Sequence, residues 1–452
     1  ASLRRASRSA FCAMAPLGMR SSSLAAPGLL LLSLAMCYVA IMNYIRIELS
    51  RDPADVSYSE IAVFVKTFLR AMTLGAALAY SLHSREFRAK MFMMGYGAVV
   101  MVLTSDMKWS KSELPNPDGI KGKATGSKRI IFIRHGESLW NEAFNGSKMP
   151  HKFLYQTAKA LVGEFVLLPE ADSVLIDSPL NHLGFSQAKQ LARAIGQYPR
   201  GRQHDQSPQL DRDVAALRGQ VSSLITCSNL RRAAQTAVVA LWQRLEPTPA
   251  ARSKESDDDE EGGKVHGKVH GKVGGFSDIV KVLSCLQEVS RNVDAMALTP
   301  ASRPVELQGA GSSVRDSLGL EGDLDVDELF DSSSNTGNKR LFGTGLVRLN
   351  DFCDFALNQQ EEVIIVAGHS LWFKHFFNTY LPRGKIDSGP AVDAKDCKMK
   401  NGGCVAFTLE RGSVNGSYVY RADPDSFTVV EGGFDNKKKY LKAMKEKAKK
   451  NQ

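Results

Sequence analysis

The stretch RIIFIRHGESLWN, Arg129–Asn141, combines an apolar run with a glycine turn and two residues suited to chemistry, Arg134 and His135. Its first part, Arg129–Ile133, is a short run of β-branched and aromatic residues, which is typical of a buried strand. Gly136 then predicts a turn. In an α/β protein, a turn after a strand places its side chains at the carboxyl edge of the sheet, where ligands bind. The stretch therefore predicts a strand that delivers Arg134 and His135 to such an edge.

A second apolar run, VIIVA at Val363–Ala367, predicts another buried strand. Between these strands, apolar residues recur at helical spacing over Ser186–Gly196, Ala233–Leu245 and Leu346–Leu357. Strands that alternate with helices indicate an α/β fold in which helices cover both faces of one sheet.

The pair Arg134-His135 is suited to phosphoryl chemistry. A neutral histidine is a competent nucleophile toward phosphorus, and the guanidinium of an adjacent arginine matches the oxygens of a phosphate group. Three residues such as Arg-His-Gly recur by chance, however, and a histidine packed in the core is the simpler interpretation. The other motifs of the sequence distinguish a nucleophilic His135 from a histidine packed in the core.

Four motifs occur in a consistent order. RHGESLWN (Arg134–Asn141) resembles the signature of the histidine phosphatase, or phosphoglycerate mutase-like, superfamily. DSPLNHLGFSQA (Asp177–Ala188) and TCSNLRRAAQTA (Thr226–Ala237) resemble its next two segments, and VAGHSLWF (Val366–Phe373) resembles its second-histidine motif. The resemblance covers roughly residues 128–410 and implies a three-layer α/β/α sandwich of the phosphoglycerate mutase type.

The resemblance also implies a set of roles. His135 is the nucleophile, and Arg134, Arg232 and a protonated His369 surround the phosphoryl group. Asn141 binds the phosphate, and Ser138 assists. Since the arginines supply the positive charge, neither a metal nor a cofactor is expected. His375, six residues after His369, is expected on a helix face rather than as a ligand.

The family's proton donor lies between the second arginine and the second histidine. Glu288, in CLQEVSRNVDAMA, matches it best, and Asp294 and Glu306 are the alternatives. A partly apolar setting would raise the pKa of such an acid into a useful range.

One departure from the family bears on the reaction. Phosphoglycerate mutases carry a substrate-pocket segment rich in Arg, Phe, Gly and Trp after the first motif, where this chain has an apolar insertion, Ala143–Ser173. The expected activity is therefore hydrolysis of a phosphomonoester through a phosphohistidine. Mutase-type phosphotransfer and a non-catalytic phosphate-binding scaffold are the alternatives. A phosphorylated small molecule, a lipid or a protein remains open as the substrate.

The net charge of +10 is concentrated at the two ends of the chain. Eight lysines lie between Lys437 and Lys450, and the first 28 residues hold four arginines and no acid. What remains is close to neutral, so the sequence gives no reason to expect a nucleic-acid partner. The seven cysteines show no spacing typical of a zinc or redox site.

Three apolar segments precede the catalytic region. Gly28–Ile45 approaches the ~20 residues that a membrane-spanning helix needs. Ile61–Leu82 and Met91–Thr104 are weaker candidates that either span or lie in the interface plane, so one to three membrane helices are expected. The lysines between residues 107 and 128 favour a cytosolic side for the domain that follows.

The expected organisation follows from these segments. Residues 1–27 are a basic targeting segment or tail, 28–105 a membrane region, 106–127 a linker, 128–430 the catalytic domain and 431–452 a lysine-rich tail. Loop insertions are expected at Pro199–Arg212, at 247–275 and at 299–338. The second of these contains the repeat GKVHGKVHGKVGG, whose His266 and His270 are interpreted as part of a low-complexity loop.

Overall fold

The computed structural model describes residues 85–109, 114, 116–145, 150–167, 170–199, 207–247, 272–273, 275–386 and 389–435. The apolar runs Gly28–Ile45 and Ile61–Leu82, the His266 and His270 repeat and the lysine tail lie outside these ranges. Within them, no helix is both long enough and apolar enough to cross a membrane. The third apolar segment, Met91–Thr104, belongs to the helix α3, Arg85–Leu103.

By its internal contacts the chain divides into two units. One comprises Ala1–Met91 and Leu168–Ala171, and the other comprises Phe92–Leu167 and Asp172–Gln452. The second unit contains every motif of the sequence, and it also contains residues 92–127, which the sequence assigned to a membrane region and a linker.

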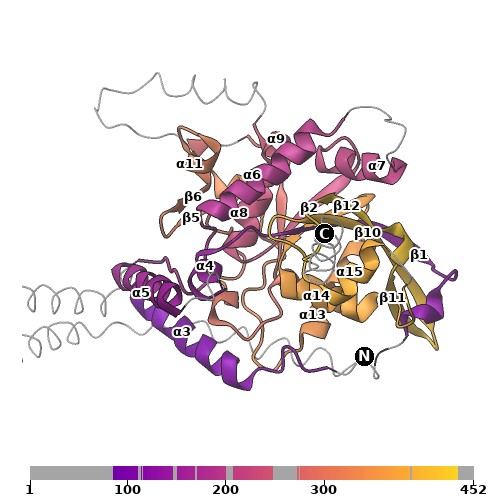
Figure 1. The fold of residues 1–452 in the computed structure, drawn as a ribbon, viewed down its shortest axis with the longest axis horizontal. Helices are drawn as coiled ribbons and strands as arrows, with labels where there is room; N and C mark the ends of the chain where they lie inside the picture. Colours follow the sequence, from indigo (N-terminus) through magenta and orange to yellow (C-terminus); the bar gives the residue numbers. More distant parts are fainter. Residues whose placement is uncertain are drawn as a thin grey trace, which may run out of the picture. The chain divides into compact units, whose positions relative to one another are not determined.

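A single mixed sheet forms the centre of this second unit (Figure 1). Its strands run in the order β11-β10-β1-β9-β2-β4-β8, and β12 also pairs with β10. The strands are β1 (Gly126–Arg134), β2 (Ser223–Ser228), β4 (Val280–Leu283), β8 (Phe330–Asp331), β9 (Val363–Gly368), β10 (Cys404–Val414), β11 (Ser417–Ala422) and β12 (Thr428–Glu431). β1, β9, β2, β4 and β8 are mutually parallel, whereas β10 runs antiparallel to β1.

Successive side chains of β1 point to opposite faces of the sheet and enter two separate cores. Ile131 and Ile133 pack with α6, α7 and α8, whereas Ile130 and Phe132 pack with α13, α14 and α15. These helices are α6 (His182–Gln197), α7 (Pro208–Leu217), α8 (Arg231–Ala240), α13 (Gly345–Leu357), α14 (Ser370–Tyr380) and α15 (Pro390–Asp396). In Figure 1 the first three lie above the sheet and the last three below it. The predicted α/β fold with helices on both faces is confirmed.

The predicted elements differ from the observed ones mainly at their ends. The helix expected at Ala233–Leu245 is divided at Leu241 into α8 and the short α9, Trp242–Leu245. The expected insertion Pro199–Arg212 already contains the start of α7, where Ser207 caps the first turn by accepting from the Gln209 N–H. The apolar insertion Ala143–Ser173 contains the end of α4 (Leu139–Asn145) and all of α5 (Pro150–Val166).

The segment Thr299–Asn338, expected as a loop insertion, holds short regular elements. Its strand β8 extends the main sheet, because Phe330 pairs with Val280 of β4. Its other elements are β5 (Gln308–Gly309), β6 (Ser312–Ser313), β7 (Asp323–Leu324), α11 (Val314–Leu318) and α12 (Val326–Leu329); β5 pairs with β6, and β7 pairs with β3 (Lys272–Val273). Short 3-10 turns occur at Pro117–Ile120 (η3), Ser284–Leu286 (η4), Val293–Ala295 (η5) and Pro424–Ser426 (η6).

Candidate active site

The two motif histidines emerge from adjacent strands at one edge of the sheet. β1 and β9 are parallel, and Arg134 is in register with Gly368, so His135 and His369 leave the sheet side by side. The N–H of His135 donates to the Gly368 carbonyl at 3.0 Å. The centroids of the two imidazole rings lie 5.1 Å apart. The structure therefore brings together the first and the last of the four motifs.

His135 is held in the form that a nucleophile requires. Its Nδ1 lies 2.6 Å from the Gly136 carbonyl oxygen, which can only accept a hydrogen bond, so Nδ1 carries the proton and Nε2 keeps its lone pair. The side chain is buried. That burial, and next the charges of Arg232 and Arg134, hold the pKa of His135 well below its usual value. The imidazole is therefore neutral at neutral pH.

Two glycines bring the first and second motifs into contact. A Cβ added to Gly136 would lie 2.4 Å from the Gly184 carbonyl oxygen, and one added to Gly184 would lie 2.1 Å from that of Glu137. Backbone this close to backbone leaves room for glycine alone. The third motif joins the same contact, because the Gly136 N–H donates to Thr236 Oγ1 at 3.1 Å.

Arg232 is the central cation of the site. It lies in the first turn of α8 and is buried, and its Nη2 donates to Glu288 Oε2 at 2.8 Å. Its Nη1 donates to the carbonyl oxygen of Asp294 at 2.9 Å, and the Asp294 carboxylate lies 3.5 Å from Nη2. Burial opposes its charge, but Asp294 and Glu288 favour the charge and raise its pKa. Arg232 is thus a permanent cation flanked by two carboxyl groups.

Of the three predicted acids, the structure places two beside Arg232. Glu288 and Asp294 are both buried, whereas Glu306 is exposed between buried neighbours. Burial raises the pKa of Asp294 to about 7, an effect that Arg232 opposes and Glu288 reinforces. Asp294 Oδ1 has no hydrogen-bond partner among the described residues. Asp294 is therefore placed to exchange a proton near neutral pH, and Glu288 lies beside the same guanidinium.

His369 follows β9, and its ring lies beside that of His135. It is fully buried, and neither ring nitrogen has a hydrogen-bond partner within the described ranges. Burial, followed by the charges of Arg232 and the neighbouring ring of His135, lowers its pKa well below its usual value. The imidazole is therefore neutral rather than protonated here. A phosphate dianion beside it would favour the protonated form.

Arg134 ends β1 with its guanidinium near the same edge. Its Nη1 donates to the carbonyl oxygen of Met399, and its Nε has no partner among the described residues. Burial lowers its pKa to about 10, a shift that Glu288 opposes. The group is still charged at neutral pH and offers an unused donor to an anion.

The two remaining predicted residues lie where α4 begins. Ser138 is buried, and its Oγ accepts a hydrogen bond from the Asn141 N–H at 3.3 Å, which is how a serine caps a helix. Asn141 is half-buried in the first turn of α4. Ser138 thus has a structural role in this arrangement. His375 lies on α14 and packs against the Trp109 ring with centroids 5.0 Å apart, on a helix face as expected.

A buried ion network that the sequence did not reveal holds the Glu288 segment in place. Lys339 Nζ donates to the carbonyl oxygens of Glu288, at 3.0 Å, and of Ser290. The same ammonium contacts Asp106 Oδ2 at 3.0 Å, and Arg348 Nη1 contacts Asp106 Oδ1 at 2.7 Å. All of these charges are paired inside the protein. The network therefore fixes the backbone from which Glu288 reaches Arg232.

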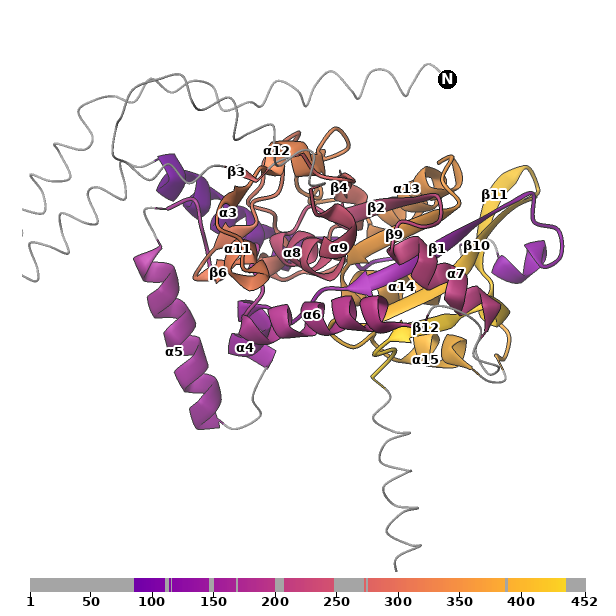
Figure 2. The same cartoon turned by 90° about the horizontal axis from the view of Figure 1, so that it is seen from above.

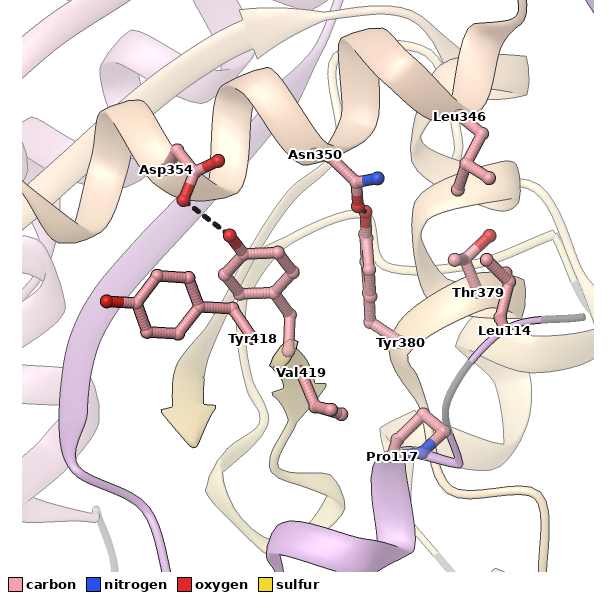
Figure 3. Close-up of a pocket in the computed structure, with 10 residues that line it drawn as sticks. Leu114, Pro117, Leu346, Asn350, Asp354, Thr379, Tyr380, Tyr418 and Val419 are labelled. Atoms are coloured by element: carbon pink, nitrogen blue, oxygen red, sulfur yellow. Dashed lines mark hydrogen bonds between the residues drawn. The ribbon is translucent and has the colours of Figure 1, made fainter. Parts of the chain in front are cut away.

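A pocket of about 260 Å³ lies elsewhere, between α13, α14 and β11 (Figure 3). Asn350 and Asp354 point into it from α13, where Asn350 accepts from Tyr380 Oη at 2.6 Å and Asp354 accepts from Tyr420 Oη. Strand register places it away from the histidines, since Arg411 pairs with both Tyr420 and Gly126, the first residue of β1. This pocket is therefore separate from the sheet edge that carries His135 and His369, called the catalytic edge below.

Within the described ranges, no group of three or more His, Cys, Asp or Glu side chains is placed to hold a metal ion. The five cysteines described, Cys227, Cys285, Cys353, Cys397 and Cys404, are free thiols.

No protein-family model matches this chain, and no curated protein matches it by sequence. Solved structures similar to it include a mycobacterial glucosyl-3-phosphoglycerate phosphatase, at 13% identity and a TM-score of 0.26, with 66% of this chain and 97% of the other covered. A phosphoserine phosphatase from Entamoeba histolytica matches at 13% identity and a TM-score of 0.25, covering 68% and 96%. An ecdysone phosphate phosphatase from Bombix mori matches at 12% identity and a TM-score of 0.25, covering 66% and 93%. Similarity at this level assigns no activity to this chain.

Proposed function

We propose that this chain is a membrane-tethered phosphomonoester hydrolase that works through a phosphohistidine on His135 without a metal. The observation that carries the proposal is the state of His135. A neutral imidazole, with Nδ1–H bound to the Gly136 carbonyl and Nε2 free to attack, lies among Arg134, Arg232 and His369. The lone pair on Nε2 has no evident structural role, whereas it can attack a phosphorus electrophile directly.

The first half of the reaction forms the N–P bond. His135 Nε2 attacks the phosphorus in line while the P–O bond to the leaving alcohol breaks. Arg232 and Arg134 bind the phosphoryl oxygens and stabilise the charge that develops on them. His369, whose ring nitrogens are both available among the described residues, adds a further donor once the anion has raised its pKa.

A carboxyl group must protonate the departing alkoxide. We assign this role to Glu288, which Arg232 and the Lys339 network hold in place. In the second half, water attacks the phosphohistidine, Glu288 accepts a proton from that water and the N–P bond breaks. Asp294 is the second candidate, because its pKa of about 7 lets it retain a proton at neutral pH.

Trapping of the intermediate tests this proposal. Full-length protein mixed with labelled p-nitrophenyl phosphate and quenched rapidly should carry acid-labile, base-stable phosphate, and His135→Ala should carry none. His375→Ala is a matched control, because this histidine packs on Trp109 away from β1 and should leave trapping intact. Turnover should also survive a strong chelator. A His135→Ala protein that keeps most of its activity would contradict the proposal. Phosphate binding without any turnover would favour a non-catalytic scaffold.

The proposal also covers the class of substrate and the membrane location of the chain. A phosphorylated small molecule, a lipid headgroup or a phosphoprotein fits the site, and no nucleic-acid partner is proposed. The apolar runs before residue 85 would tether the chain to a membrane, with the catalytic domain on the cytosolic side.

A further inference from the structure

Large apolar side chains are exposed mainly on two helices, α3 and α5. On and just after α3 they include Phe92, Val99, Val102 and Leu103, of which Val102 is 77% exposed. On α5 they are Phe153, Leu161, Val162 and Val166, of which Val162 is 63% exposed. We call these eight residues the apolar face. A folded domain that left such a surface in water would lose the stabilisation that burial gives, so a face of this kind marks a binding site.

The part of α3 from Phe92 onward and the helix α5 lie at the same end of the second unit. Met94 of α3 and Ala160 of α5 pack into one small core with Ala143, Val174 and Leu175. Figures 1 and 2, seen from directions at right angles, both show α3 and α5 on the side away from β10 and β11. The exposed apolar residues therefore lie on neighbouring elements rather than scattered over the domain.

Each helix packs against one of the segments that carry the active site. α3 approaches the segment that contains Glu288 and Asp294, because a Cβ on Gly97 would lie 3.1 Å from a methyl group of Val293, next to Asp294. Tyr96 Oη also donates to the carbonyl oxygen of Lys339 at 3.2 Å. α5 packs against α4, which starts directly after Ser138. The two helices that carry the apolar face thus pack, through other residues, against segments that form the catalytic edge.

The sequence of α3 and of the segments before it indicates what covers the apolar face. No charged residue occurs from Met91 to Leu103. The 84 residues before α3 contain the two long apolar runs Gly28–Ile45 and Ile61–Leu82, and the second ends three residues before α3 begins. A chain that entered a bilayer through these apolar runs would return to the bilayer surface at α3. Lys108, which follows α3, and Lys159 on α5, which lies 3.6 Å from Glu142, are exposed and would meet anionic headgroups.

We propose that the apolar face lies in the surface of a lipid bilayer, and that the enzyme takes its substrate from that bilayer as a lipid phosphomonoester. This inference rests on the proposed function and specifies its substrate class. A headgroup phosphate that enters the site while its acyl chains remain in the membrane needs an apolar surface beside the catalytic edge, which α3 and α5 provide. A water-soluble phosphate ester needs none.

The test compares one lipid and one soluble substrate on the same protein. Full-length protein reconstituted into phosphatidylcholine vesicles is assayed on phosphatidic acid in the same vesicles and on p-nitrophenyl phosphate in the buffer. In the double variant Val102→Asp/Val162→Asp, the ratio of lipid to soluble turnover should fall by about tenfold, which corresponds to ~1.4 kcal/mol of docking free energy. Ile279→Asp is the matched control. Ile279 is exposed just before β4, at the amino ends of the parallel strands and so opposite the catalytic edge. The ratio of lipid to soluble turnover should not change in this variant.

A fluorescence measurement reports on the docking directly. A tryptophan introduced by Val102→Trp should be quenched when the vesicles contain brominated lipid, and one introduced by Ile279→Trp should not. An unquenched Val102→Trp would overturn the inference. If its emission were also that of a buried indole, a second copy or another part of the chain would cover the face instead.

Different outcomes would overturn the lipid-substrate inference and the phosphatase proposal. Unchanged lipid-to-soluble ratios in an enzyme that turns over p-nitrophenyl phosphate would overturn the lipid inference and leave the phosphatase proposal standing. Absence of turnover on both esters would overturn the phosphatase proposal, and with it the assignment of the substrate class.

Discussion

His135 and His369 lie at the ends of two adjacent parallel strands, with ring centroids 5.1 Å apart and planes tilted by 57°. Both rings are buried beside Arg134 and Arg232. Two imidazoles so close together and so near two guanidinium groups cannot both be protonated without a counter-ion. Burial and these charges therefore lower the pKa of both rings, and a phosphate dianion beside them would favour protonation.

The pH dependence of activity follows from this arrangement. A histidine with an ordinary pKa of ~6.5 would lose its nucleophilic form as the pH falls below that value. The pKa of His135 is lowered, so its neutral form persists to lower pH. We expect kcat/KM for p-nitrophenyl phosphate, corrected for ionisation of the substrate, to show no acid limb near pH 6.5. A limb at that pH would mean that His135 is solvated.

The same shift links folding to pH. Because the folded-state pKa of His135 is depressed, the unfolded chain binds more protons than the folded chain below pH ~6.5, and stability declines as the pH falls through that value. Thermal unfolding of wild type and His135→Asn between neutral and mildly acidic pH measures this effect. The variant should show the smaller decline.

The contact between Gly136 and Gly184 gives a prediction about stability. In Gly184→Ala the new Cβ would meet the Glu137 carbonyl oxygen at 2.1 Å, and backbone must move to relieve the clash. We expect a loss of ~1–3 kcal/mol in the free energy of unfolding, together with a loss of activity, because the shift reaches His135. Denaturant unfolding measures the first and p-nitrophenyl phosphate hydrolysis the second.

Gly196→Ala serves as the control, since it lies in the same helix, α6, and its Cβ would meet only the flexible side chain of Gln243 at 3.2 Å. Alanine is the better helix former, so stability should be kept or slightly increased. Equal destabilisation in the two variants would show that the close contact is not specific to the motif.

The sequence predicted the parts of this site that local patterns encode. The run Arg129–Ile133 and the run Val363–Ala367 are strands, and the motifs that follow them meet because parallel strands end at the same edge. Apolar spacing likewise predicted α6 and α13. These features depend on residues close together in the chain, or on the general geometry of parallel sheets.

The sequence could not predict the network of Asp106, Lys339 and Arg348. Asp106 lies more than 200 residues from its two partners, and the hydrogen bonds of Lys339 to Glu288 and Ser290 use carbonyl oxygens, which every residue has. No side-chain pattern marks such contacts. The lowered pKa of His369 has a related origin, since it follows from burial and from charges distant in the sequence, which no local pattern marks.

The two acids beside Arg232 can be separated by the choice of leaving group. If Glu288 is the proton donor, Glu288→Gln should slow hydrolysis of an alkyl phosphate by roughly 10²–10⁴-fold, and that of p-nitrophenyl phosphate far less, since nitrophenolate needs little protonation. Asp294→Asn should then slow both esters to a similar and smaller extent. The reverse pattern would assign the acid to Asp294. Steady-state rates on the two esters provide the measurement.

The last prediction concerns the segment Gly28–Ile45, which contains no charged residue. At ~25 cal/mol per Å² of apolar area, even partial exposure of a helix of this composition to water would cost several kcal/mol. Insertion into a bilayer removes that cost, with Arg20 and Arg46 at the two interfaces. The full-length protein should therefore sediment with membranes, resist extraction by high salt and by carbonate, and dissolve in detergent. The lysines from Lys437 to Lys450 would add an attraction to anionic lipid that salt weakens, so deletion of this tail should leave the carbonate-resistant fraction unchanged. Release of the full-length protein by salt alone would show that it is held at the membrane surface by charge, and that Gly28–Ile45 does not span the bilayer.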